Sequence, residues 1–151
     1  MKFYKQFITY LVEVAEGNTI VDLKKVDLDQ LVRSIDLSYG SAKDGMELVT
    51  IDVAKFDELW KSDPFYIGQG GSGDGVREKY QKALKFFLLD PHTRQRGAGH
   101  IEASEVDVSD DSIGVLQGRH RYSVLRDAGV KKLPVAMTPE SIKKAKKLGL
   151  V

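Results

Sequence analysis

The sequence predicts a compact single domain over residues 1–151 with a mixed α/β (α+β) fold, in which helices flank a small mixed sheet. Three observations predict it. Amphipathic helical periods alternate with short apolar, strand-like runs along the chain. The sequence contains no internal repeat and no linker. Its 151 residues, 42% hydrophobic and 30% charged, suffice for one core.

The first quarter of the chain predicts two helices. Residues 3–15 mix helical and alternating spacings, and the length of the run favours a helix. Asp27 is placed to cap a second helix. The apolar residues of that helix share one face: Leu28, Leu31, Val32 and Ile35. Tyr39-Gly40-Ser41 predicts its end.

A short strand is predicted over Glu47–Ile51, and Asp52 is placed to cap the next helix. The apolar face of that helix contains Phe56, Leu59 and Trp60. Asp63-Pro64 predicts its end, because the residue before a proline disfavours helical backbone. The run Phe65-Tyr66-Ile67 is then expected to be buried.

Five glycines in eight positions, Gly68–Gly75, precede an amphipathic helix predicted over Val76–Leu89, with Tyr80, Leu84, Phe87 and Leu88 inward. Successive backbone N–H groups in such a loop can hold an anion. The candidate nucleotide-binding residues here are Gly70, Gly71, Ser72 and Gly73. A flexible turn without a ligand is the alternative. If this loop lies near the glycine turn at residue 118, then Ser72, Asp74 and Arg77 are candidate contacts.

Residues 92–100 lack an apolar period and predict an exposed basic loop, which contains His92, Arg94, Arg96 and His100. The alternative is a contact to phosphate or nucleic acid. A hairpin is predicted next, with strands Val106–Val108 and Ile113–Leu116 around the turn Ser109–Ser112. The final helix is predicted to begin at Thr138-Pro139-Glu140. Its lysines are expected to form a solvated face: Lys143, Lys144, Lys146 and Lys147.

The segment 113–135 combines a strand, a glycine turn, a helix and a second strand. Gly129 is placed to end the helix in a Schellman motif, with Val130 returning to Leu125. The short connections predict a parallel strand pair with residues 117–121 at the carboxyl edge of the sheet.

Gly118, Arg119, His120 and Arg121 open this helix, and their residue types suit phosphate. A helix N-terminus attracts anions, and an arginine can hold phosphate oxygens with two parallel N–H donors. His120 can act as an acid or base near neutral pH and is the candidate catalytic residue. The alternative is that these cations only complete the first turn.

The Gly118-Arg119-His120-Arg121-Tyr122 run, followed by Leu125, Gly129 and Leu133-Pro134-Val135, resembles the Gly-x-His-Arg signature of the ParB/sulfiredoxin superfamily. With the glycine-rich loop, it is similar to the small uncharacterised ParB-like (ParB-like nuclease domain) proteins of bacteria and their phages. The resemblance covers residues 113–137. It implies a compact mixed fold of this type and a nucleotide whose phosphates are held by Gly118, His120 and Arg121.

The resemblance does not extend to every activity of that superfamily. Sulfiredoxins carry a catalytic cysteine where this chain has Arg119, and the chain has no cysteine, which excludes sulfiredoxin activity. The leading expectation is binding of a nucleoside di- or triphosphate (ATP, ADP or CTP type), with Mg²⁺-dependent phosphoryl transfer or hydrolysis as one use of the site. Candidate Mg²⁺ ligands lie just upstream, unless they form only a charged hairpin edge: Glu102, Glu105, Asp107, Asp110 and Asp111.

Two other functions stay open at this point. One is a nuclease or DNA-binding protein, and the other is a non-enzymatic phage or mobile-element protein that modulates a host or partner protein. A net charge of +1 argues against tight non-specific DNA binding, since affinity scales with the number of neutralised phosphates. The absence of cysteine, of a secretory pattern and of a run of about 18 apolar residues favours a cytoplasmic protein without a membrane partner.

Overall fold

The computed structural model describes residues 27–73, 77–88, 101–110 and 112–151, without the side chains of residues 77 and 85–88, and its fold is mixed α+β. The chain divides into two compact units. Unit 1 consists of Met1–Ser34, Ile67–His100 and His120–Val130. Unit 2 consists of Ile35–Tyr66, Ile101–Arg119 and Lys131–Val151. None of the helices in the described residues is long and apolar enough to span a membrane.

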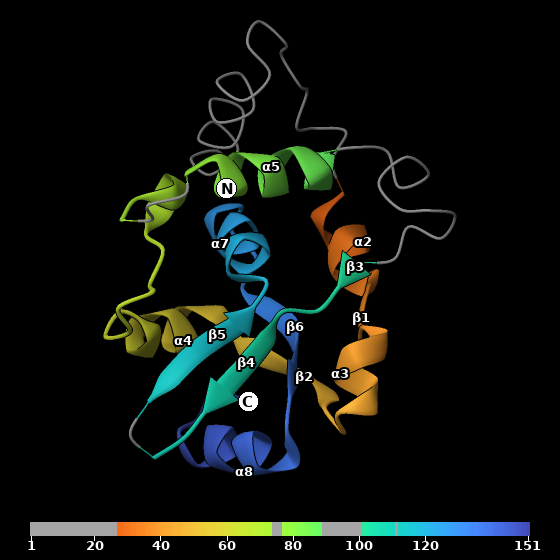
Figure 1. The fold of residues 1–151 in the computed structure, drawn as a ribbon, viewed down its shortest axis with the longest axis vertical. Helices are drawn as coiled ribbons and strands as arrows, with labels where there is room; N and C mark the ends of the chain where they lie inside the picture. Colours follow the sequence, from red (N-terminus) through yellow and green to blue (C-terminus); the bar gives the residue numbers. More distant parts are fainter. Residues whose placement is uncertain (1–26, 74–76, 89–100, 111) are drawn as a thin grey trace, which may run out of the picture. The chain divides into compact units, whose positions relative to one another are not determined.

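Unit 2 contains a four-stranded sheet with the order β2-β6-β4-β5 (Figure 1). Its strands are β2 (Glu47–Asp52), β4 (Glu105–Val108), β5 (Ile113–Gln117) and β6 (Lys132–Met137). β6 pairs antiparallel with β2 and parallel with β4, and β4 pairs antiparallel with β5. A second, two-stranded sheet pairs β1 (Ile35–Asp36) in parallel with β3 (Ile101–Glu102).

The expected parallel pair around the helix after Gly118 is wrong. β4 lies between β5 and β6, so β5 and β6 run in opposite directions in one sheet. The predicted hairpin at Ser109–Ser112 is confirmed and explains this order, because its tight turn places β4 directly against β5. Gln117 faces Glu105, the first residue of β4, and Glu105 in turn faces Ala136 near the end of β6.

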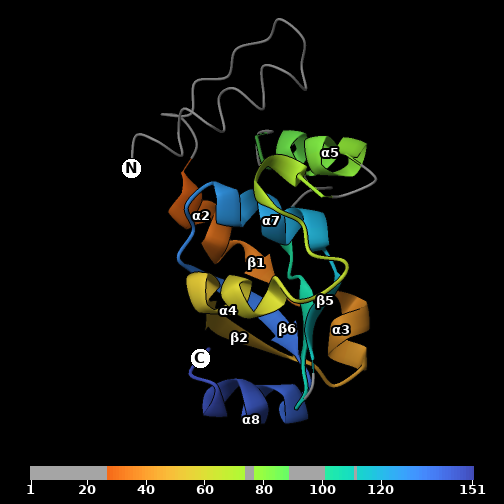
Figure 2. The same cartoon turned by 90° about the vertical axis from the view of Figure 1, so that its left-hand side faces the viewer.

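The helices of unit 2 begin where side-chain oxygens can cap them. α3 (Tyr39–Lys43), α4 (Val53–Trp60) and α8 (Pro139–Lys147) are capped by Ser38, Asp52 and Thr138. α4 packs on β2 and β5, and α8 packs on β4 and β6 (Figure 2). The core between them includes Ile51, Phe56, Trp60, Leu133, Val135 and Met137.

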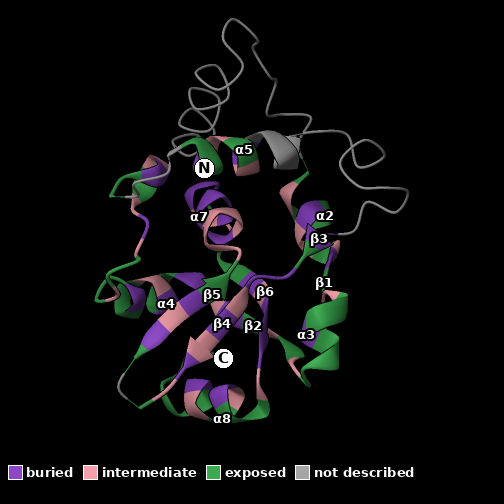
Figure 3. Cartoon of the chain, viewed as in Figure 1, coloured by how far each residue is buried: buried purple, intermediate pink, exposed green. Residues whose placement is uncertain are grey.

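Unit 1 is helical. It contains α2 (Leu28–Arg33), a single 3-10 turn at Gln69–Gly71, α5 (Arg77–Leu88) and all of α7 (Arg119–Asp127) except its first residue. Its buried hydrophobic residues come mainly from α2, α5, α7 and the segment before the 3-10 turn (Figure 3), and they include Leu31, Ile67, Tyr80, Leu84, Tyr122, Val124 and Leu125. The inward positions predicted for Tyr80 and Leu84 are confirmed.

Three local expectations are corrected. α2 ends at Arg33 and does not continue to Tyr39, because Ser34 caps it and Ile35 enters the pairing of β1 with β3. Leu59 is 41% exposed, since Val53, Phe56 and Trp60 form the buried face of α4. Phe65 is 66% exposed, and Ile67 is the buried residue of its run. The helix expected over 3–15 lies outside the described residues.

Candidate functional site

The strand–turn–helix unit around Gly118 forms as predicted. β5 ends at Gln117, Gly118 has a φ of 77°, and α7 begins at Arg119. A positive φ is the conformation that glycine adopts without steric cost, so the residue type matches the turn. The strand therefore passes directly into the N-terminus of a nine-residue helix.

Ser104 ties this turn to the sheet. Its buried hydroxyl donates a 2.9 Å hydrogen bond to the carbonyl oxygen of Gly118, and its own carbonyl oxygen accepts from the N–H of Ala136 in β6. The ladder between β4 and β5 is irregular at this end, where Glu105 faces Gln117 but Val106 faces Val115. A β-bulge of this kind bends a strand and re-aims its side chains, and bulges are frequent beside functional sites.

The first turn of α7 is electrostatically suited to an anion. It contains Arg119, His120 and Arg121 and no acidic residue. All three side chains are half-buried. The first N–H groups of a helix have no partner within the helix, and the aligned peptide dipoles place partial positive charge there. Fixed N–H donors and cationic side chains therefore coincide in one turn of chain.

Arg119 also has a structural role that no sequence pattern indicated. Its Nη1 donates a 2.9 Å hydrogen bond to the carbonyl oxygen of Phe65, and its guanidinium carbon lies 5.6 Å from the centroid of the Phe65 ring. The two residues are 54 positions apart in the chain, and no local pattern links them. Arg119 therefore anchors the segment that precedes the glycine-rich loop.

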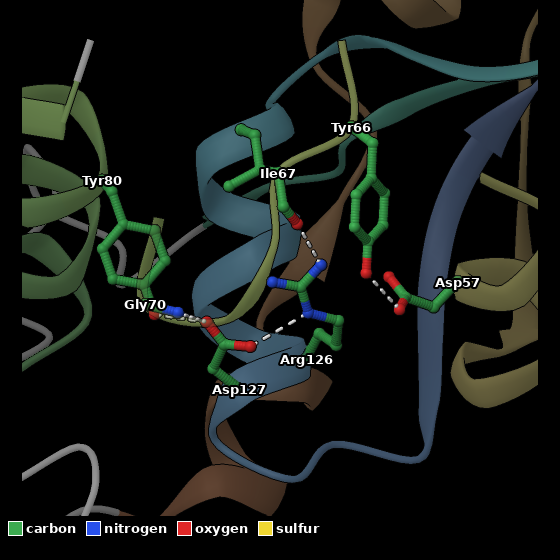
Figure 4. Close-up of polar contacts among 7 residues, drawn as sticks. All are labelled: Asp57, Tyr66, Ile67, Gly70, Tyr80, Arg126 and Asp127. Atoms are coloured by element: carbon green, nitrogen blue, oxygen red, sulfur yellow. Dashed lines mark hydrogen bonds and ion pairs between the residues drawn. The ribbon is translucent and has the colours of Figure 1, made fainter. Parts of the chain in front are cut away.

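The glycine-rich loop binds an anion of its own chain (Figure 4). The N–H of Gly70 donates to Oδ2 of Asp127, the last residue of α7, at 2.9 Å. The same oxygen accepts from the hydroxyl of Tyr80 at 2.5 Å, and Oδ1 accepts from Nε of Arg126 at 3.0 Å. Arg126 also donates to the carbonyl oxygen of Ile67 at 2.5 Å.

The loop is held further by its packing. A Cβ atom on Gly71, which has a φ of 86°, would lie 3.1 Å from Cβ and Cγ of Tyr80. Ser72 and Gly73 are exposed, and the carbonyl oxygen of Ser72 accepts from Gly68. The structure thus brings Gly70 to the last residue of α7, eight residues or about 12 Å along the helix from Arg119. Asp74 and the side chain of Arg77 lie outside the described residues.

Burial raises the pKa of the Tyr80 hydroxyl well above its ordinary value, and the adjacent Asp127 carboxylate raises that pKa further. The ring of Tyr80 is fully buried, and only 3% of the Asp127 side chain is exposed. A neutral tyrosine can donate to the carboxylate, whereas a tyrosinate would repel it. Tyr80 is therefore a hydrogen-bond donor across the physiological pH range.

The acidic candidates for Mg²⁺ do not gather in the part of the chain that the structure describes, where no three His, Asp or Glu side chains form a possible metal site. Asp107 accepts a hydrogen bond from Ser141, and Asp110 pairs with Lys144. Asp111 and the basic loop 92–100, with its two histidines, lie outside the described residues. On α8, Lys143, Lys146 and Lys147 are exposed, as expected for a solvated face.

Comparison of the chain with family models, with curated proteins and with solved structures finds no match.

Proposed function

We propose that the protein binds a nucleoside di- or triphosphate through the turn Gly118–Arg121. One observation carries this proposal: α7 begins directly after a glycine with positive φ, and its first turn holds three basic residues and no acidic one. In this proposal the backbone N–H groups of the first turn bind phosphate oxygens. His120 and Arg121 donate to the same phosphates, as the resemblance to the ParB/sulfiredoxin superfamily implies.

The proposal gives the two glycine regions different roles. Gly118 lets the backbone approach the phosphates, while the N–H of Gly70 is engaged by the Asp127 carboxylate. The loop residues Gly70, Gly71, Ser72 and Gly73 then support α7 from its other end. Mg²⁺ would accompany the nucleotide as its phosphate counterion. Phosphoryl transfer or hydrolysis with His120 as acid or base is the reaction to assay once binding is measured, in a protein that we place in the cytoplasm.

Isothermal titration calorimetry with ATP, ADP, CTP and GTP, with and without Mg²⁺, tests the proposal. We expect micromolar binding of at least one nucleotide by the wild type. The His120→Ala/Arg121→Ala double variant should lose roughly ten- to hundredfold in affinity, since charge-assisted hydrogen bonds are the strong ones.

A matched control removes two exposed cations elsewhere. The Lys146→Ala/Lys147→Ala variant on α8 should keep the wild-type affinity, because its side chains project from a different helix. A folded wild type that binds none of the four nucleotides, or a double variant at 120 and 121 that binds as the wild type does, would overturn the proposal.

A further inference from the structure

Phe65 is an exposed aromatic residue on a fixed piece of backbone. The residue is 66% exposed. Its backbone N–H and its carbonyl oxygen are nevertheless both fixed by hydrogen bonds to side chains. The N–H donates to Oδ1 of Asp63 at 3.0 Å, and the carbonyl oxygen accepts from Arg119 at 2.9 Å. Asp63 is fixed in turn by the indole N–H of the buried Trp60, which donates to its Oδ2 at 3.0 Å.

The ring is also linked to the start of α7. The guanidinium of Arg119 lies over it, with 5.6 Å between the guanidinium carbon and the ring centroid. A cation over one face of an aromatic ring attracts that face and does not cover the opposite face. Phe65 is thus presented beside the first residue of the helix at which the phosphates are proposed to bind.

We propose that Phe65 is the stacking surface for the base of the bound nucleotide. This inference rests on the proposed function, because it takes the phosphates to lie at Gly118–Arg121. Stacking suits the site for two reasons. Every base offers an aromatic face, and a ring held by its backbone loses little conformational freedom on binding. The ligand class is therefore a phosphate that carries an aromatic base, in preference to a bare polyphosphate.

The test compares nucleotides with tripolyphosphate, which has the phosphates but no base. The variants are Phe65→Ala, Phe65→Leu, which keeps apolar bulk without an aromatic face, and Phe65→Trp, which keeps the aromatic face. Tyr39→Ala is the matched control, since Tyr39 is another exposed aromatic residue of unit 2, 85% exposed on α3. The nucleotide is the one that the wild type binds most tightly among ATP, ADP, CTP and GTP.

We expect Phe65→Ala and Phe65→Leu to weaken nucleotide binding roughly five- to hundredfold and to leave tripolyphosphate binding unchanged. Phe65→Trp should keep the affinity, and the new indole fluorescence should be quenched by the nucleotide. Tyr39→Ala should bind both ligands as the wild type does. Circular dichroism of each variant checks that it is folded.

The outcomes distinguish a failure of the proposed stacking role from a failure of the proposed nucleotide binding. Unchanged nucleotide affinity in Phe65→Ala overturns the stacking role alone. An equal loss for nucleotide and tripolyphosphate also overturns it, because the ring would then act only by holding Arg119. A wild type that binds tripolyphosphate and nucleotides equally overturns the role of the base. A wild type that binds neither overturns the proposed function and the inference with it.

Discussion

Asp127 is a carboxylate removed from water at the end of α7, where the helix dipole does not favour a negative charge. Its burial is compensated by three donors: the N–H of Gly70, the hydroxyl of Tyr80 and Nε of Arg126. A buried charge needs such partners, since the desolvation cost of an ion is several kcal/mol. The three donors come from the glycine-rich loop, α5 and α7, so one side chain joins all three.

Removing the hydroxyl of Tyr80 should destabilise the protein and change its response to alkaline pH. We expect Tyr80→Phe to lose about 1–3 kcal/mol of unfolding free energy at pH 7, because the buried carboxylate loses a donor. In the wild type the folded-state pKa of Tyr80 is raised. The stability that it contributes is therefore complete below pH 10 and is lost as pH rises above that value, by about 1.4 kcal/mol per pH unit.

Urea unfolding of the wild type and of Tyr80→Phe between pH 7 and pH 11 measures both effects. The difference in free energy between the two proteins should shrink above pH 10. Tyr39→Phe is the control at pH 7, where its exposed side chain should leave the unfolding midpoint unchanged. A difference between wild type and Tyr80→Phe that stays constant up to pH 11 would show that the hydroxyl is not protected from ionisation.

Local hydrogen bonds fix many of the helix ends in the described part of the chain. Asp27, Ser38, Asp52 and Thr138 each accept a hydrogen bond from the N–H three residues later. Among the residues that the structure describes, three helices end at a glycine with positive φ: Gly45, Gly129 and Gly149. In each case the next residue donates its N–H to a carbonyl five positions back, which is the Schellman motif. The Schellman end predicted at Gly129 is thereby confirmed.

Alanine substitutions separate the cost of a positive φ from the cost of a close contact. Gly149→Ala should lose about 1 kcal/mol, since φ is 73° and a Cβ meets nothing within 4 Å. Gly71→Ala should lose about 1–3 kcal/mol more, because its Cβ would also press on Tyr80. Chemical denaturation of each variant measures these losses.

Gly40→Ala is the control for this comparison. Gly40 lies inside α3, and the nearest atom to an added Cβ is Oγ of Ser38 at 3.9 Å. Alanine is the better helix former there, so we expect a gain of up to about 1 kcal/mol. Equal losses in Gly71→Ala and Gly149→Ala would mean that Tyr80 gives way and that its packing does not hold the loop.

For the whole chain, the charge balance sets an expectation for nucleic acid. With a net charge of +1, we expect only weak, non-specific DNA binding that disappears at physiological salt. Fluorescence anisotropy with labelled single- and double-stranded DNA at about 50 and 200 mM salt measures this. Submicromolar binding at the higher salt would contradict the expectation and favour the DNA-binding alternative, in which the basic loop 92–100 contacts the strand.

The features that could be predicted from the sequence are the ones fixed by local interactions. The caps at Asp27, Asp52 and Thr138, the hairpin at Ser109–Ser112 and the turn at Gly118 were all predictable. Each depends on the conformational preferences of a few adjacent residues and on hydrogen bonds that span three to five positions. The same holds for the basic first turn of α7, which is visible in the sequence as a glycine followed by three basic residues.

Contacts between distant residues were decided only by the tertiary structure. The position of β4 beside β6, the exposure of Phe65 under Arg119 and the pairing of Gly70 with Asp127 join residues 31 to 57 positions apart. Periodicity shows that a residue is apolar or that a loop can bind an anion, but not which partner reaches it. Which partner a residue contacts depends on the packing of the whole unit. In this protein the carboxylate of Asp127 accepts from the N–H of Gly70, where an external anion was expected to bind.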